Sequence, residues 1–156
     1  MQLVGRWQRV TTCQGIVNAL TNAGLRALAP GMVAGNGLVP GTPQELARKA
    51  NICTGARPRL HAHFFDRNGQ FGSLDWKGEQ VDDGPYRLLA NRKMRIGDGV
   101  FRYRITDGKL RLNPIISREA KRRALARPLQ FSTPGWMVAV AYGGLPWKRV
   151  PCGRWC

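Results

Sequence analysis

The chain lacks a long hydrophobic run. Its apolar segments are all shorter than the ~18 residues that suggest a membrane-spanning helix, and its mean hydropathy is −0.32. No apolar signal-peptide core precedes residues 4–7, VGRW. We therefore expect no membrane span. The expected location is cytoplasmic, with secretion as the alternative if a leader has been removed.

Motifs of the common enzyme classes are also absent. The chain has no Ser–His–Asp order, no phosphate-cradling glycine loop and no HExxH helix. Asp82 and Asp83 are adjacent carboxylates, but a turn explains their VDDG context. Cys13 and Cys53 have no identified histidine neighbour. We predict no cofactor and expect a binding protein rather than an enzyme.

Acidic residues are scarce. Nine Asp and Glu stand against 25 Lys and Arg, which gives a net charge of +16 and a pI of about 11.2. Such a balance is one electrostatic mark of nucleic-acid-binding domains, but we favour the alternative of basic residues scattered over solvated faces. The candidate polyanion-binding residues lie in a predicted hairpin and a predicted helix: Arg102, Arg104, Arg111, Arg118, Lys121, Arg122 and Arg123.

Cysteines are few, and all four lie outside the predicted central strands. An even number near loops and chain ends suits two disulfides, with free thiols and zinc binding as alternatives. The last two are spaced as zinc ligands can be, but no second close pair accompanies them. The disulfide candidates are Cys13, Cys53, Cys152 and Cys156.

The remaining pattern predicts a mainly β protein. A chain of 156 residues can bury one core, so we expect a single domain over residues 1–156. Strands are predicted at residues 3–11, 86–90, 93–96, 100–106, 109–115, 136–142 and 147–150, besides a hairpin within 59–76. Helices are predicted at 14–24, 43–50 and 118–126, with a loop at 29–42 and a turn at 78–84. About eight or nine strands with short helical insertions (about 14–50 and 118–126) indicate an antiparallel up-and-down β-barrel, which leaves no exposed edge.

Two hairpins give a strand register. Asn68-Gly69 favours a two-residue type I′ turn, which would place His61, His63, Phe65, Leu74 and Trp76 on one face and Asp75 on the other. Asp107-Gly108 predicts a second hairpin, in which Ile105 faces Leu110 and Tyr103 faces Leu112. In that register Arg104 faces Arg111, so this face must point outward to be screened by solvent.

Residues 4–10, VGRWQRV, resemble the Gly-x-Trp opening strand of lipocalin-like (calycin) barrels, and residues 147–150, WKRV, resemble their closing strand. The segment from His61 to Tyr86 is similar to that of uncharacterised bacterial lipocalin-like proteins. The resemblance implies a lipocalin-like barrel with a cavity for a small, mainly apolar molecule. It also implies that Trp7, after Gly5, packs on an arginine near the last strand, either Arg149 or Arg154. The helical insertion and its cysteines depart from the pattern.

The candidate ligand contacts combine aromatic and polar side chains, as small-molecule pockets do: His61, His63, Trp76, Tyr86 and Tyr103. A filled barrel interior is the alternative. His61 and His63 could also hold a metal, but a third ligand is missing. We therefore predict binding of a small hydrophobic or amphipathic molecule. The alternatives are polyanion binding through a basic outer face and a metal-dependent or barrel-cavity enzyme centred on His61 and His63. The oligomeric state is not predicted.

Overall fold

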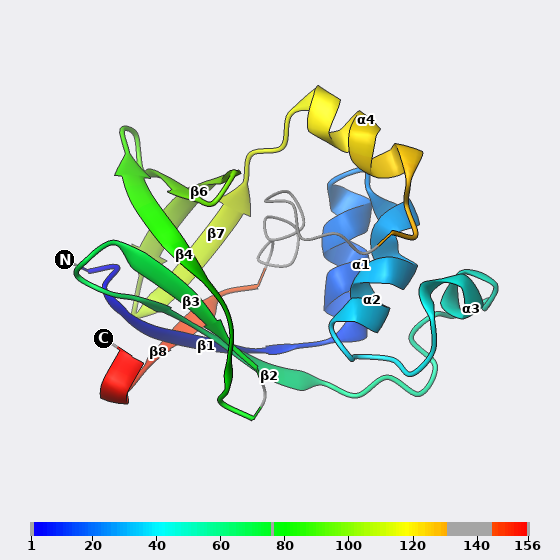
Figure 1. The fold of residues 1–156 in the computed structure, drawn as a ribbon, viewed down its shortest axis with the longest axis horizontal. Helices are drawn as coiled ribbons and strands as arrows, with labels where there is room; N and C mark the ends of the chain where they lie inside the picture. Colours follow the sequence, from blue (N-terminus) through cyan, green and yellow to red (C-terminus); the bar gives the residue numbers. More distant parts are fainter. Residues whose placement is uncertain (1, 76, 131–144, 156) are drawn as a thin grey trace.

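The protein forms a closed antiparallel barrel, seen here in a computed structural model that describes residues 2–75, 77–130 and 145–155 (Figure 1). Each strand pairs with the next in sequence, and the last returns to the first. Within the described residues the strands are β1 (Gly5–Thr11), β2 (Arg59–Phe65), β3 (Gln70–Leu74), β4 (Gln80–Leu89), β5 (Lys93–Ile96), β6 (Gly99–Thr106), β7 (Lys109–Pro114) and β8 (Trp147–Val150). The predicted up-and-down barrel with short helical insertions is confirmed. The predicted strand at 136–142 lies outside the described residues.

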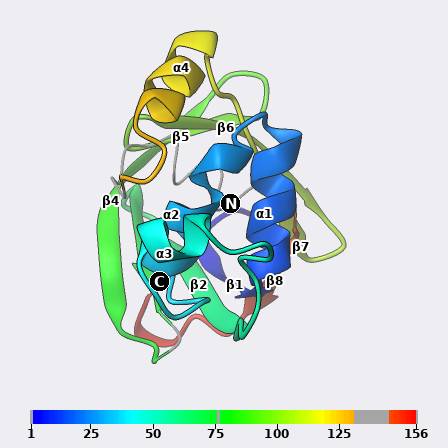
Figure 2. The ribbon, with the colours of Figure 1, turned by 90° about the vertical axis from the view of Figure 1, so that its right-hand side faces the viewer.

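Short helices gather at one end of the barrel, where β1 ends and β2 begins; we call it the helical end (Figures 1 and 2). They are α1 (Cys13–Asn22), the 3-10 helix η1 (Arg26–Leu28), α2 (Ala29–Gly35), α3 (Pro43–Ala47) and α4 (Arg118–Ala126), with a second 3-10 helix, η2 (Gly153–Trp155), near the C-terminus. Side chains cap the starts of three of them, namely Thr12, Thr42 and Ser117. At Thr42 the predicted capping box with Glu45 is present.

Two predicted irregular segments are regular. The expected loop at 29–42 contains α2, because Pro30 lies in the first helical turn, where no intrahelical N–H donor is needed, and Met32 and Val33 are buried. The expected turn at 78–84 is mostly strand, since β4 already begins at Gln80. A register shift between Ser73 and Leu74 allows this early start.

The hairpin of β2 and β3 differs from prediction by one residue. Asp66 N–H donates to the Gln70 carbonyl at 2.9 Å, and Asp66 Oδ1 accepts from the N–H groups of Asn68 and Gln70, both at 2.8 Å. Because Asp66 pairs with Gln70, the loop between them has three residues and not the two of a type I′ turn. Gly69 is the loop residue with positive φ (81°).

This change reverses the faces assigned to β3. His63 pairs with Ser73 and Ala62 with Leu74. A shift of one residue moves every side chain of a strand to the opposite face. Leu74 therefore lies outside the barrel wall with Ala62 and Phe64, and the predicted grouping of Leu74 with the histidines is wrong. The β6–β7 register, by contrast, is confirmed at Ile105–Leu110, Tyr103–Leu112 and Arg104–Arg111.

The barrel interior away from the helical end contains a cluster of buried side chains. Its buried members are mostly aromatic or large aliphatic residues: Leu3, Trp7, Phe65, Phe71, Tyr86, Met94, Ile96, Phe101, Leu110, Leu112 and Trp147. These side chains form the aromatic and aliphatic core of the barrel.

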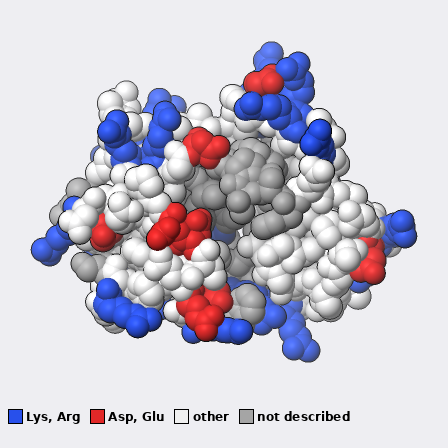
Figure 3. Space-filling model, in the orientation of Figure 1, with Lys and Arg blue, Asp and Glu red and all other residues white. Residues whose placement is uncertain are grey.

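The surface in the orientation of Figure 1 carries acidic side chains near its middle and basic side chains at its periphery (Figure 3). β4 contributes the exposed Asp82 and Asp83. Within the described residues no helix is both long and apolar enough to cross a membrane.

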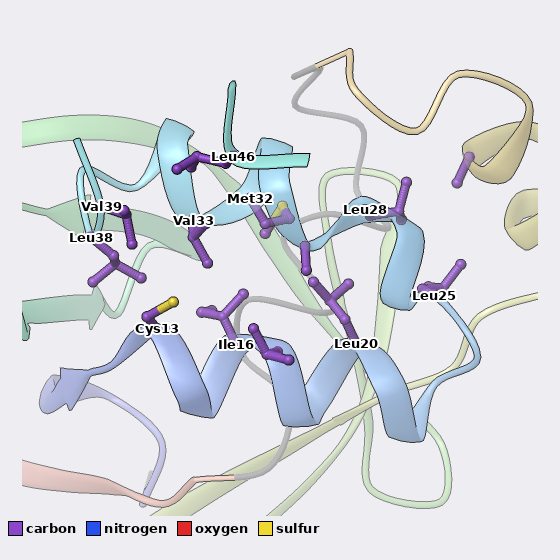
Figure 4. Packing of buried hydrophobic residues seen from close by; sticks show 13 residues of the cluster. Cys13, Ile16, Leu20, Leu25, Leu28, Met32, Val33, Leu38, Val39 and Leu46 are labelled. Atoms are coloured by element: carbon purple, nitrogen blue, oxygen red, sulfur yellow. The ribbon is translucent and has the colours of Figure 1, made fainter. Parts of the chain in front are cut away.

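A second core lies among the helices. Ile16 and Leu20 of α1 point toward Met32 and Val33 of α2 (Figure 4). A disulfide joins Cys13 to Cys53, across a sequence separation of 40 residues. Cys152 is also disulfide-bonded, whereas Cys156 lies outside the described residues. No pairing was predicted from the sequence, and the prediction that the cysteines are oxidised holds for the three described ones.

Candidate functional site

The inner face of the barrel becomes polar toward the helical end. Trp7 pairs with His63, Arg9 with His61 and Thr11 with Arg59 across β1 and β2. Residues paired across antiparallel strands share a face, and alternate residues of one strand do so too. The inner face therefore passes from Trp7 at the packed core to the polar cluster, which we define as Arg9, Thr11, His61, His63 and Ser73.

His63 is the most enclosed member of the polar cluster. It is 1% exposed, and its Nδ1 lies 3.0 Å from Ser73 Oγ, in a hydrogen bond whose donor depends on the imidazole tautomer. Its ring stacks on Phe71, with centroids 5.0 Å apart, and meets Trp147 edge-on at 4.3 Å. The aromatic core and the polar cluster thus meet at this histidine.

Arg9 brings a positive charge into the barrel. It is 9% exposed, its Nη1 donates to the Leu145 carbonyl at 3.4 Å, and its Cζ lies 4.5 Å from the centre of the Trp147 ring. This placement is a cation–π contact in a desolvated setting, where such contacts are strongest.

Both histidines are held neutral near pH 7. Burial lowers the pKa of His61 to about 4, with the charge of Arg9 acting in the same direction and Asp75 opposing it. Burial is the main cause that holds the pKa of His63 well below its usual value, and electrostatic repulsion from His61 and Arg9 lowers it further. The two rings, with centroids 4.7 Å apart, therefore act as hydrogen-bonding groups rather than as cations.

Asp75 stands beside His61, contrary to prediction. The sequence placed it on the opposite face, but the one-residue register change brings it to the inner side, where it lines a cavity together with His61. Its Oδ1 accepts from the N–H groups of Lys77 (2.8 Å) and Glu79 (3.0 Å), which fixes the turn into β4.

A cavity of about 380 Å³ opens at the helical end between the barrel and α2; we call it the rim cavity. Its wall combines polar and apolar groups: Thr11, Ala34, Gly35, Asn36, Gly37, Leu38, Arg59, Leu60, His61, Asp75 and Val81. Thr11 Oγ1 and His61 Nε2 are buried and have no hydrogen-bond partner among the described residues. Thr11 is 6% exposed, and a buried unsatisfied group of this kind costs about 1–3 kcal/mol.

A larger cavity, of about 500 Å³, lies among the helices and is lined by residues such as Gln14, Arg26, Pro30, Lys49 and Leu129. No member of the polar cluster lines this larger cavity. We therefore place the candidate site at the rim cavity, where buried polar atoms and open volume coincide.

The predicted ligand residues are brought together only in part. His61 lines the rim cavity and His63 lies next to it. Tyr86 sits in the packed core, where its hydroxyl donates to the Asp66 carbonyl at 2.7 Å and its ring meets Phe65. Tyr103 lines a different cavity, of about 300 Å³, with Leu3 and Ile105. Trp76 lies outside the described residues.

The residues expected to close the barrel base do lie together. The Arg149 guanidinium lies over the Trp7 ring, with its Cζ 4.6 Å from the ring centre, and donates to the carbonyls of Val4 (3.1 Å) and Gln2. A side chain on Gly5, whose φ is 148°, would approach Arg149 Nη1 to 3.0 Å. Arg154, the other candidate for this role, stacks on Trp155 instead.

The groups that the site offers are hydrogen-bonding ones, since Thr11 and His61 line the rim cavity. Within the part of the chain that the structure describes, no three His, Cys, Asp or Glu side chains are placed to hold a metal ion. Ser73 and His63 lie at the distance that nucleophilic catalysis uses, but both are buried and neither lines the rim cavity.

Sequence reasoning missed Arg9, Thr11, Ser73 and Trp147. The signal for the first two was present, because residues 7, 9 and 11 alternate on one strand and Trp7 was already expected inside. Ser73 was hidden by the register error. Trp147 was assigned to the last strand without a face, since a four-residue strand offers little periodicity.

No protein-family model, curated protein or solved structure matches the chain. The class that the fold and the site define is a closed eight-stranded antiparallel barrel with a polar cluster at its helical end.

Proposed function

We propose that the protein binds a small amphipathic molecule in the rim cavity, with a polar group of the ligand reaching Thr11 and His61. The observation that carries this proposal is that Thr11 and His61 both line the same cavity of about 380 Å³, while Thr11 Oγ1 and His61 Nε2 are buried without a hydrogen-bond partner among the described residues. A ligand that hydrogen-bonds to them would remove the cost of leaving them unsatisfied.

The amphipathic character of the ligand follows from the cavity wall. Leu38, Leu60 and Val81 supply apolar surface, while Thr11 and His61 converge from neighbouring strands. Since this cavity opens between the barrel and α2, the ligand would lie across the helical end, next to the hydrophobic cluster of the barrel interior. This narrows the sequence-based prediction, which allowed a purely hydrophobic molecule.

We also propose that the chain is one lipocalin-like domain. Consecutive pairing of all eight strands, closure of β8 on β1 and the stacking of Arg149 on Trp7 support this assignment.

The test uses the fluorescent amphiphile 1-anilinonaphthalene-8-sulfonate as a probe, titrated into the wild-type protein and into Thr11→Val and His61→Phe variants. We expect the probe to bind the wild type and each variant to bind it roughly tenfold more weakly, which corresponds to about 1.4 kcal/mol for one lost hydrogen bond. Thr106→Val is the matched control, because it makes the same change at an exposed strand position. Equal affinity in all four proteins would refute the proposal.

A native mass spectrum of the purified protein would show whether a natural ligand is retained. A bound mass in the wild type that is absent from His61→Phe is the expected result.

A further inference from the structure

The outer wall of β4 to β7 places like charges opposite one another in three successive strand pairs. Tyr86, Met94 and Phe101 point inward and are buried, so their sequence neighbours point outward. The outward residues pair as Arg87 with Arg95, Lys93 with Arg102 and Arg104 with Arg111. We call these six residues the basic wall. Lys109 faces Lys148 in the same way across β7 and β8.

This arrangement places charges of the same sign side by side on the barrel surface. Like charges directly opposite in a sheet are destabilising, and strands about 4.8 Å apart keep the groups within one Debye length of each other. Five members of the basic wall are exposed and Lys93 is half-buried. From Arg87 onward, no outward position of β4 to β8 carries Asp or Glu. A polyanion laid along the wall would replace repulsion with attraction.

We propose that the basic wall binds the phosphate backbone of double-stranded nucleic acid. Five of its six members are arginines, whose planar guanidinium groups pair with phosphate oxygens in a bidentate manner. Their positions repeat about every 4.8 Å across the strands and about 7 Å along them, and the rigid barrel holds this array in place. Contacts to phosphates alone would recognise a duplex without reading its sequence.

Two other partners fit the surface less well. Single strands are held by aromatic side chains on which bases stack, and no outward position of the wall is aromatic. Peripheral membrane binding relies on apolar anchors as well as charge. The large exposed hydrophobic residues of the described chain include Val81 on β4 and Ile115 just after β7, but none of them is a member of the basic wall; the others are Val10, Leu60, Leu125 and Leu145.

Helix α4 is a separate basic surface and provides the control. It contacts η1 and lies beside the helices, away from the wall (Figure 1). Its charge is partly compensated, because Arg122 pairs with Glu119 at 2.6 Å. The sequence-based prediction grouped this helix with Arg102, Arg104 and Arg111. The structure separates the helix from these arginines and adds residues of β4 and β5 to the surface that the arginines form.

The experiment measures the fluorescence anisotropy of a labelled 20-base-pair DNA duplex with the full-length protein between 50 and 200 mM NaCl. We compare Arg104→Gln/Arg111→Gln with Arg122→Gln/Arg123→Gln, which removes the same charge from α4. Each lost phosphate contact reduces the slope of log K against log salt by about 0.9. We expect the wall variant to lose about 1.8 of that slope and to bind roughly tenfold or more weakly at 50 mM, and the α4 variant to behave as the wild type.

Several results would overturn the proposal. Duplex affinity equal to wild type in the wall variant would do so, as would an equal loss in both variants, which would mean that net charge alone acts. Tighter binding of the single-stranded form of the oligonucleotide would contradict duplex recognition. Wild-type binding to phosphatidylserine vesicles without duplex binding would assign the wall to membranes. Thermal melting checks that both variants are folded, and unchanged binding of the anilinonaphthalene probe separates this surface from the rim cavity.

Discussion

His61 and His63 are kept uncharged by their position inside the barrel. Burial is the main cause of the lowered pKa of both, and Arg9 adds to it. Neither ring gains a compensating carboxylate strong enough to reverse the effect, although Asp75 opposes it at His61. The fold is therefore linked to pH through these two residues.

This linkage predicts a loss of stability in mild acid. The pKa of His61 is about 4 in the folded protein and about 6.5 in an unfolded chain. Below about pH 6.5 the unfolded chain binds a proton that the folded protein excludes, so the free energy of unfolding falls as the pH drops from about 6.5 to about 4. The contribution of His61 is about 3 kcal/mol over that range. Urea denaturation at pH 7.5 and pH 4.5 measures it.

A His61→Asn variant is the control, because asparagine keeps polar atoms but does not titrate in this range. It should lose less stability between the two pH values than the wild type does. Equal losses in both proteins would show that His61 is not the titrating group. Carboxylates such as Glu45, whose pKa is lowered by hydrogen bonds from Thr42, contribute at still lower pH.

At the residue scale, the sequence predicted the correct strand face for some side chains and the opposite face for others. Alternation along β1 and β2 was enough to put His61 and His63 on one face. Asp75 could not be placed correctly, because its face depends on the register of β3. That register is decided by the Asp66 carboxylate and its bonds to two N–H groups, and Asn68-Gly69 alone suits two loop lengths.

Among the elements, the β2–β3 hairpin shows how one side chain specifies a register. An Asp66→Ala variant loses both hydrogen bonds from the loop N–H groups, so we expect the free energy of unfolding to fall by about 1–2 kcal/mol. Urea denaturation with the wild type as reference measures the change. Asp66→Asn retains an accepting oxygen and should recover most of the loss. An alanine variant as stable as wild type would show that the strands alone set the register.

Elements with a strong local signal were predicted almost to the residue. Helix α4 begins after the Ser117 cap and β8 covers Trp147–Val150, both as expected. Helix α2 was missed because Gly and Pro usually break helices, and only tertiary burial of Met32 and Val33 shows why this one forms. The start of β4 was missed because a bulge, which has no clear sequence mark, realigns it with β3.

For the whole molecule, barrel closure could be predicted from repeated short strands and tight turns. The division of the interior into an aromatic half and a polar end could not be predicted, because it depends on how the strands of the barrel converge. For the helical core, the sequence showed only the helical periodicity of residues 14–24. The disulfide between Cys13 and Cys53, which links this core covalently, could be assigned only from the structure.

That disulfide should be a major contributor to stability. It closes a loop across 40 residues, for which the chain-entropy model gives about 4 kcal/mol, and removal of such bonds typically costs 2–5 kcal/mol. We expect a Cys13→Ala/Cys53→Ala variant to have a lower urea midpoint under oxidising conditions. A reducing agent should then destabilise this variant less than it destabilises the wild type. An unchanged midpoint in the variant would contradict this prediction.

Thr11 pairs with Arg59 where β1 ends and β2 begins, so the helical insertion leaves and rejoins the barrel at neighbouring positions. All eight strands of the described chain lie outside residues 12–58, so closure does not require any backbone pairing from the insertion. The ends of β1 and β2 are near enough for a tight turn to join them directly. The insertion is therefore joined to the barrel only between the end of β1 and the start of β2. Insertions of different length or chemistry at this position would give proteins that share the same barrel and differ in the segment covering its helical end.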